Sequence, residues 1–206
     1  MSKGDANTKE LTAALRTPDL DDAAATAAEK LARRADENGL LDVAYASADT
    51  PLGTMLVAGT RRGLVRVAFP SEPEEDILFE LAESVSPRIL HSPARLDEVR
   101  REMEQYFEQR RDRFEERLDW RLTRGFYRDV LRATKRVPYG ETMSYAEIAA
   151  RAGRPMAFRA AGSALGSNPM PLIVPCHRII ASGGGLGGYG GGLDVKEYLL
   201  ELEGAR

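Results

Sequence analysis

The chain has 206 residues, of which 43% are hydrophobic and 30% are charged, and such values are typical of a globular protein with one domain or two small ones. No apolar run approaches the roughly 18 residues of a membrane span, and no apolar segment follows the N-terminal basic residue as in a secretion signal. We therefore expect a cytoplasmic protein, associated with the nucleoid if it is bacterial, with no membrane partner.

The cysteine, histidine and charge content narrows the chemistry further. Cys176 is the single cysteine and cannot form an internal disulfide, while His91 and His177 add too few ligands for a structural zinc site. We expect no metal. The net charge of −3 argues against a general affinity for polyanions, so a nucleic-acid partner would require a local basic surface.

Residues 1–40 are rich in alanine and charged residues. The segment DDAAATAAEKLARRADENG, residues 21–39, contains strong helix formers and stops at Asn38 and Gly39, which are typical of a helix end. We expect a helical or flexible N-terminal extension that is solvated, since its apolar residues are mostly alanine. A helix that docks a partner is the alternative.

Residues 41–120 form the first predicted domain. LDVAYAS, TPLGTMLVAGT and RRGLVRVAFP, separated by glycine-containing turns, predict an antiparallel meander. EPEEDILFELAES predicts a helix, and LDEVRREMEQYFEQRRDRF predicts a second one with an apolar stripe of Leu96, Val99, Met103, Tyr106 and Phe107. Acids and bases alternate on that helix, which favours a solvated outer face over nucleic-acid binding.

Residues 121–206 form the second predicted domain, which is mostly helical. After the helix in GFYRDVLRATKRVPYGE, two short helices flank a break at Gly153, with Ser144 as the cap of the first. This arrangement predicts a helix-turn-helix, although a helical hairpin in a core has the same pattern. Nucleic-acid binding is favoured by local charge, because the only acid in this stretch is Glu147 and its bases are Arg151, Arg154, Arg159 and Arg178. The fold class is therefore α/β, or α+β.

The segment IVPCHRII, residues 173–180, places Cys176 within an apolar run directly before His177 and Arg178. A buried cysteine is usually inert, but two buried ionisable neighbours need compensating partners. Only a thiolate is a good nucleophile, so a base must be in reach. If the run is an extended strand, neighbouring side chains point to opposite faces, and the imidazole acts through a water molecule or a kinked backbone. An orienting acid would come from the terminal helix, which offers Glu197, Glu201 and Glu203.

The residues around the cysteine resemble a known family. Pro175, Cys176, His177 and Arg178, preceded by Asn168 and Pro169 and followed by GYGGGL, are similar to the O6-alkylguanine-DNA alkyltransferases. VPYGETMSYAEIA and FRAAGSALGSNP resemble the family's helix-turn-helix, and SADTPLGTMLVAGTRRGLVRVAF resembles its N-terminal ribonuclease-H-like sheet domain. The resemblance covers roughly residues 42 to 204.

This resemblance implies a DNA repair protein that accepts an alkyl group once and irreversibly. Its substrate would be duplex DNA containing O6-alkylguanine, with O4-alkylthymine as a second lesion, and the damaged base would be rotated out of the helix. No cofactor is implied. We expect a monomer, and leave open whether it binds cooperatively along DNA. The resemblance assigns Cys176 as acceptor, His177 as water-mediated base, Glu203 as orienting carboxylate, Asn168 as brace and Tyr145 as donor to the departing guanine, with phosphate contact as an alternative for Tyr145.

The resemblance also implies contact residues. Arg159 would be the finger that fills the space left by the flipped base, because its guanidinium can stack and hydrogen-bond. The helix beside it would enter the minor groove. The implied DNA contacts are Tyr145, Arg154, Ala157, Phe158, Arg159, Ala160, Gly162 and Ser182, and the implied pocket residues are Leu165, Pro171, Ile179, Tyr189 and Gly190.

The chain departs from the family at Gly190, where many relatives have serine, and at the glycine run of residues 183–185, which predicts a mobile loop that tolerates larger alkyl groups. Three rival functions can be separated from repair by stoichiometric alkylation of the thiol. They are a non-catalytic lesion binder, an alkylation-sensing regulator, and a cysteine hydrolase that would need a distant histidine.

Overall fold

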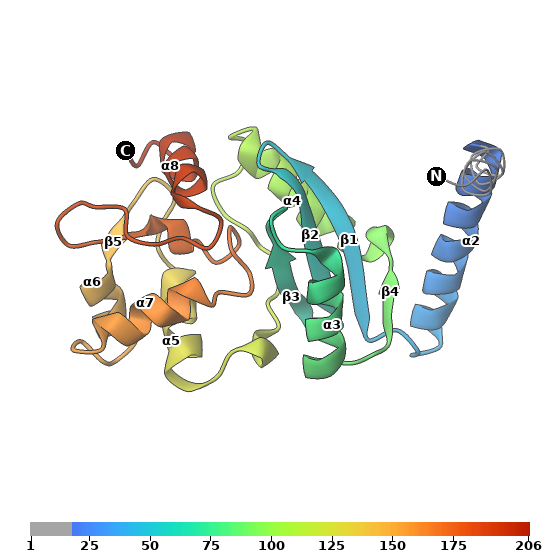
Figure 1. Ribbon diagram of the computed structural model, residues 1–206, viewed down its shortest axis with the longest axis horizontal. Coiled ribbons are helices and arrows are strands. Elements are labelled where there is room, and N and C mark those ends of the chain that lie inside the picture. Colours follow the sequence, from blue (N-terminus) through green and yellow to red (C-terminus); the bar gives the residue numbers. More distant parts are fainter. Residues whose placement is uncertain (1–17) are drawn as a thin grey trace, which may run out of the picture. The chain divides into compact units, whose positions relative to one another are not determined.

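The protein is described by a computed structural model that covers residues 18–206, without the side chains of residues 18–22 and 25 (Figure 1). It divides into two compact units, the first ending at Leu41 and the second spanning Asp42–Arg206. Within this described part, no helix is both long and apolar enough to cross a membrane.

The described part of the first unit is a helix, α2 (Pro18–Glu37). It ends as predicted, because Gly39 has a φ of +71° and the Asn38 side chain donates to the carbonyl oxygen of Arg34 at 2.7 Å. The predicted extension before residue 18 lies outside the described residues.

The second unit begins with a sheet in the order β3-β2-β1-β4. The three strands β1 (Val43–Thr50), β2 (Gly53–Thr60) and β3 (Gly63–Ala68) form the predicted antiparallel meander. A fourth strand, β4 (Ile89–His91), pairs in parallel with β1 and was not predicted from the sequence. Three residues are too few to show the alternation that marks a strand.

Helices cover both faces of this sheet (Figure 1). On one face, α3 (Glu74–Ser84) packs Ile77 and Leu81 against strand residues such as Ala58. On the other lie the short 3₁₀ helix η1 (Pro93–Leu96) and α4 (Asp97–Phe107), as the approach of the Leu96 side chain to Gly59 indicates. The predicted apolar stripe is buried at Leu96 of η1 and at Val99, Met103 and Tyr106 of α4.

The remaining residues form a mostly helical half around a second core. After the 3₁₀ turn η2 (Trp120–Leu122), its helices are α5 (Gly125–Thr134), α6 (Tyr145–Arg151), α7 (Phe158–Gly166) and α8 (Leu193–Leu202). The predicted cap of α6 is present, because Ser144 accepts from the Glu147 amide and the Glu147 carboxylate accepts from Ser144. With Gly153 at a φ of +85° in the turn, α6 and α7 form the predicted helix-turn-helix.

The segment around Cys176 differs from the predicted strand. Cys176–Arg178 is a 3₁₀ helix, η3, and only β6 (Ile179–Ile180) is extended, in parallel with β5 (Met143–Ser144). Pro175 has no backbone donor, and the amide of Cys176 turns back to the carbonyl oxygen of Val174 at 2.7 Å. The argument from alternating strand faces is therefore wrong for Cys176 and His177.

Candidate active site

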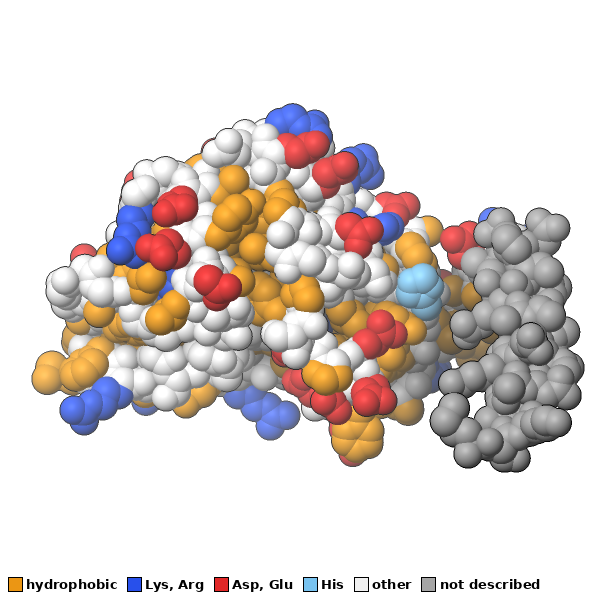
Figure 2. All heavy atoms as spheres, turned by 45° about the horizontal axis from the view of Figure 1, so that its top comes forward, with side chains coloured by type: hydrophobic (Ala, Val, Ile, Leu, Met, Phe, Trp, Pro, Cys, Tyr) orange, Lys and Arg blue, Asp and Glu red, His pale blue; other side chains and the backbone are white. Residues whose placement is uncertain are grey.

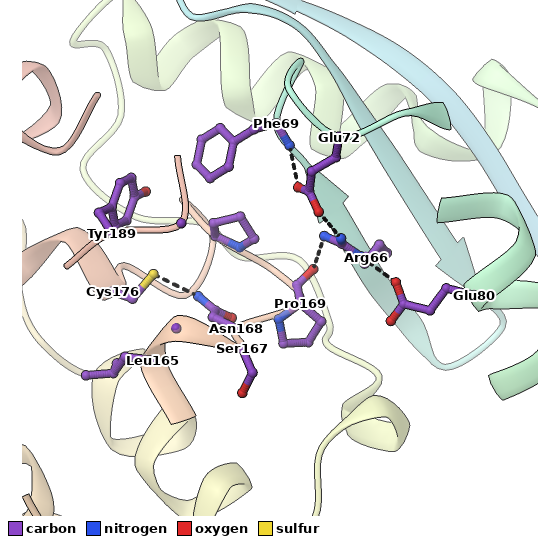
Figure 3. Close-up of a pocket in the computed structure, with 13 residues that line it drawn as sticks. Arg66, Phe69, Glu72, Glu80, Leu165, Ser167, Asn168, Pro169, Cys176 and Tyr189 are labelled. Atoms are coloured by element: carbon purple, nitrogen blue, oxygen red, sulfur yellow. Dashed lines mark hydrogen bonds and ion pairs between the residues drawn. The ribbon is translucent and has the colours of Figure 1, made fainter. Parts of the chain in front are cut away.

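The Cys176 thiol is held by Asn168. The Asn168 side-chain nitrogen donates to the sulfur at 3.1 Å and to the carbonyl oxygen of Val174 at 2.9 Å (Figure 3). Its side-chain oxygen accepts from the amide of Met170 at 3.1 Å. A single amide thus connects the end of α7, the loop before the cysteine and the sulfur itself.

The thiol is protonated in this environment. Burial raises the pKa of Cys176, although the Asn168 hydrogen bond and the positive charge of Lys196 oppose the rise. A base must remove the proton during the reaction.

Behind the cysteine, His177 and Arg178 share one carboxylate. The Nε2 atom of His177 lies 2.8 Å from Oε1 of Glu203, and the Arg178 guanidinium donates to both carboxylate oxygens at 2.8 Å. The carboxylate is also the acceptor for the Tyr106 hydroxyl from α4. All four side chains are buried, so the two ionisable neighbours of the cysteine have the compensation they require.

The charges of this cluster fix the tautomer of the imidazole. Burial opposes ionisation of Glu203, but the hydrogen bonds from His177 and Arg178 outweigh it and lower its pKa to about 2. Burial lowers the pKa of His177, and Glu203 opposes this only in part. Because an ionised carboxylate only accepts, the neutral imidazole carries its proton on Nε2. Its Nδ1 atom keeps a lone pair, is buried and has no hydrogen-bond partner among residues 18–206.

Two cavities border Cys176. The helix-side cavity, about 500 Å³, is lined by Tyr145, Gly162, Gly187 and Gly188 together with five residues that it shares with the other cavity. The sheet-side cavity, about 380 Å³, is lined by Arg66, Phe69, Glu72 and Glu80 of the sheet half and by Ser167, Asn168, Pro169 and Pro171 (Figure 3). The shared residues are Leu165, Gly166, Cys176, Tyr189 and Gly190.

Comparisons with known proteins agree with this geometry. Residues 43–120 match the ribonuclease-like domain of 6-O-methylguanine DNA methyltransferase, and residues 125–205 match the DNA binding domain of that protein. The methylated-DNA–protein-cysteine methyltransferase of Methanosarcina acetivorans is 40% identical over 161 residues, covering 78% of this chain and 98% of the relative. The chain belongs to the 6-O-methylguanine DNA methyltransferase family.

Other relatives in the family cover a similar share. The inducible methylated-DNA–protein-cysteine methyltransferase of Bacillus subtilis is 39% identical over 149 residues, or 71% of this chain and 82% of the relative. Mycobacterium tuberculosis O6-methylguanine methyltransferase has a TM-score of 0.67 at 36% identity, with 80% of this chain and 94% of that chain covered. Mycobacterium tuberculosis OGT in complex with DNA has the same TM-score at 35% identity, with 79% and 93% covered. The predicted fold class is confirmed.

Four of the five residues that the family resemblance places in the pocket line a cavity at the sulfur. Pro171 lines the sheet-side cavity, and Leu165, Tyr189 and Gly190 line both cavities. Ile179 does not, because its side chain is fully buried in the core of the helical half. The prediction for Ile179 is therefore wrong.

The residues that the family resemblance assigns to DNA lie mostly on or beside α7. Arg159 and Phe158 are exposed in its first turn, with the guanidinium 5.8 Å from the ring centre, and Arg154 lies 5.1 Å from the ring centre of Phe126. Gly162 lies against the Tyr145 ring. The other predicted DNA contacts are half-buried or exposed, and they are Ala157, Ala160 and Ser182.

The basic surface near α7 is smaller than the sequence indicated. Arg178 is buried with Glu203 and cannot contact DNA, so it does not belong to this surface as predicted. Arg151, Arg154 and Arg159 remain exposed. On the face in Figure 2, acidic and basic side chains are interspersed without a continuous basic field. Three of the four arginines of the predicted basic surface therefore remain available on it.

Two buried side chains near the site, Lys196 and Tyr106, were not among the predicted site residues. Lys196 of α8 donates to the carbonyl oxygens of Ile179 and Leu186, and burial lowers its pKa to about 8. Tyr106 was assigned only to an apolar stripe. A signal existed for Lys196, because it lies at helical spacing with the buried Leu199, Leu200 and Glu203.

Proposed function

We propose that the protein repairs duplex DNA by transferring the alkyl group of O6-alkylguanine, and of O4-alkylthymine, irreversibly to the Cys176 sulfur. The observation that carries the proposal is the position of the thiol at the meeting point of two cavities, backed by the His177 and Glu203 pair. Membership of a family whose relatives are named methylated-DNA–protein-cysteine methyltransferases supports it.

The geometry suits a displacement at carbon. The thiol proton passes through a water molecule to Nδ1 of His177, whose positive charge Glu203 then stabilises. The sulfur–carbon bond forms while the carbon–O6 bond breaks, and the electron pair of that bond goes to the guanine. The guanine takes a proton from the Tyr145 hydroxyl at N3, and the proton on His177 returns to Tyr145 through solvent. One thiol and one alkylguanine thus give one thioether and one guanine.

The state of Tyr145 supports its role as donor. Burial raises the pKa of Tyr145, and the neighbouring Cys176 raises it further, so the hydroxyl keeps its proton at neutral pH. Tyr145 lines the helix-side cavity, where a flipped base would lie against the glycines of the loop after β6.

Base flipping costs a few kcal/mol of stacking and pairing. Arg159 is exposed at the start of α7, and we infer that it enters the duplex and offsets part of this cost. Phe158 beside it has 44% of its surface exposed and offers a second ring to the flanking base.

The proposal also assigns a role to each domain, an oligomeric state and a cellular location. Residues 41–120 support the site, residues 121–206 bind DNA and perform the chemistry, and residues 1–40 are an extension. The protein would act as a monomer on chromosomal DNA in the cytoplasm. Sedimentation of the protein alone and with duplexes of increasing length tests the monomer and any cooperativity.

The decisive experiment weighs the intact protein after incubation with duplex containing O6-methylguanine. Repair requires a gain of one methyl group per chain, located on Cys176 by peptide mapping. Cys176→Ala should bind the duplex without any transfer. No gain of mass with wild type would favour a lesion binder, and methylation of another residue would refute the role of Cys176.

A further inference from the structure

The sheet-side cavity opens beside the reacting sulfur (Figure 3). A base in the helix-side cavity would place its O6 substituent next to Cys176, which borders both cavities. Leu165 and Tyr189 also belong to both walls. The two cavities are therefore neighbouring spaces that share Cys176 and the residues around it.

The geometry of displacement needs space on that side. When sulfur attacks a carbon in line with the departing oxygen, the three other groups on that carbon lie in a plane across the line. For a methyl group these are hydrogens, but for a longer substituent the rest of the chain must project sideways. A cavity of about 380 Å³ lies within the range that holds small organic groups.

Apart from Asn168, whose amide donates to the sulfur, the inner wall of this cavity is apolar. Phe69 lies edge-on to Tyr189 with ring centres 5.7 Å apart, and Leu165 and Pro171 complete this inner part. An aromatic or aliphatic group attached to the reacting carbon would therefore replace water against apolar surfaces.

The outer wall is charged. Arg66 forms ion pairs with Glu72 and, at 3.4 Å, with Glu80. The Arg66 guanidinium also donates to the carbonyl oxygens of Val67 and Pro169, so its N–H groups are already occupied by partners within the protein. Two carboxylates and one guanidinium leave a net charge of −1, and both carboxylates are more exposed than the guanidinium.

We propose that the sheet-side cavity receives the O6 substituent, and that Glu72 and Glu80 make it select apolar substituents with neutral or cationic ends over substituents with anionic ends. This inference rests on the proposed alkyl transfer and adds its substrate class. The selecting residues belong to the sheet half, away from the helix-turn-helix.

Two free-base substrates test the selection without the charge of DNA. They are O6-benzylguanines with a para aminomethyl group, which is cationic, or a para carboxyl group, which is anionic. The second-order rate constant of each is measured from the alkylated fraction in intact mass spectra. For wild type we expect the cationic substrate to react about fivefold faster, as for unit charges acting across several ångströms of hydrated surface.

Charge variants locate the source of the preference. Glu80→Gln should bring the ratio of the two rate constants close to one, and Glu80→Lys should favour the carboxylate. Glu83→Gln is the matched control, since it changes the net charge equally and Glu83 is an exposed residue of the same helix α3 but does not line this cavity. The control should keep the wild-type ratio.

The outcomes separate this inference from the proposed function. If wild type transfers methyl from duplex DNA but shows equal rates for both benzyl substrates, the selection is refuted and repair stands. A ratio in Glu80→Gln equal to that of wild type refutes the assignment to this wall. Absence of any transfer from methylated duplex would overturn the proposed function and this inference together.

Discussion

Replacing Glu203 by glutamine tests the centre of the site most directly. Glutamine has nearly the shape of protonated glutamic acid, so Glu203→Gln removes the negative charge and keeps the volume. The pKa of Glu203 lies near 2 rather than 4.5. Since each pKa unit corresponds to about 1.4 kcal/mol, the shift means that the folded protein favours the carboxylate over its neutral form by about 3 kcal/mol more than water does.

We therefore expect Glu203→Gln to lower the free energy of unfolding by about 3 kcal/mol at neutral pH, because the buried Arg178 loses its partner. Alkyl transfer should slow by about tenfold to a hundredfold, the loss expected when a hydrogen bond to a charged group no longer stabilises the His177 imidazolium. The apparent pKa of the thiol should rise, so the rate should recover only at higher pH.

Chemical denaturation measures the first effect, and single-turnover transfer from O6-methylguanine duplex across a pH series measures the second. Glu201→Gln is the control, because Glu201 is an exposed glutamate in the last turn of α8, two residues before Glu203. Equal stability of the two variants, or an unchanged pH profile in Glu203→Gln, would refute the reasoning. The depressed pKa also means that this stabilisation is present above about pH 4.5 and is lost as pH falls towards 2.

Three further substitutions probe neighbouring contacts. Arg159→Ala should reduce repair of duplex by at least about tenfold, in line with the cost of flipping, but barely affect reaction with free O6-benzylguanine, and equal losses would contradict the finger role. Gly187→Ala should slow transfer about tenfold or more, because the φ of Gly187 is +69° and the new methyl group would lie 2.5 Å from the Tyr145 hydroxyl. Gly185→Ala should leave the transfer rate unchanged, because its methyl group would make only an ordinary van der Waals contact. Tyr106→Phe should lose about 2 kcal/mol in denaturation, more than Tyr139→Phe, whose hydroxyl donates to a neutral carbonyl, and a smaller loss would show that the carboxylate does not depend on it.

Local patterns predicted the elements well where they were long or capped. The meander follows from apolar runs between glycine turns, and the start of α6 follows from Ser144 and Glu147. The cysteine segment was predicted less well, because a short apolar run can be either a buried strand or a buried turn, and its pattern does not distinguish them. Pro175 was the one residue that argued for the turn.

Side-chain placement was harder to predict than the backbone. Arg178 was counted as a surface charge, and only the fold shows that it meets Glu203, which lies 25 residues later in the chain. Contacts between the two halves could not be predicted either, because they also join residues that are distant in the chain. Nothing in the sequence near Arg66 indicates that it lines the sheet-side cavity, and nothing near Tyr106 indicates that it donates to Glu203. Such contacts depend on tertiary packing.

The shared carboxylate has a consequence for how the second unit melts. Glu203 joins Tyr106 of α4 to His177 and Arg178 of the catalytic turn, so separating the two halves would remove a hydrogen-bond donor from a buried carboxylate. Residues 42–206 should accordingly lose structure in one cooperative calorimetric transition, with equal calorimetric and van't Hoff enthalpies. Two separate heat-absorption peaks for these residues would mean that the junction is weaker than its geometry indicates.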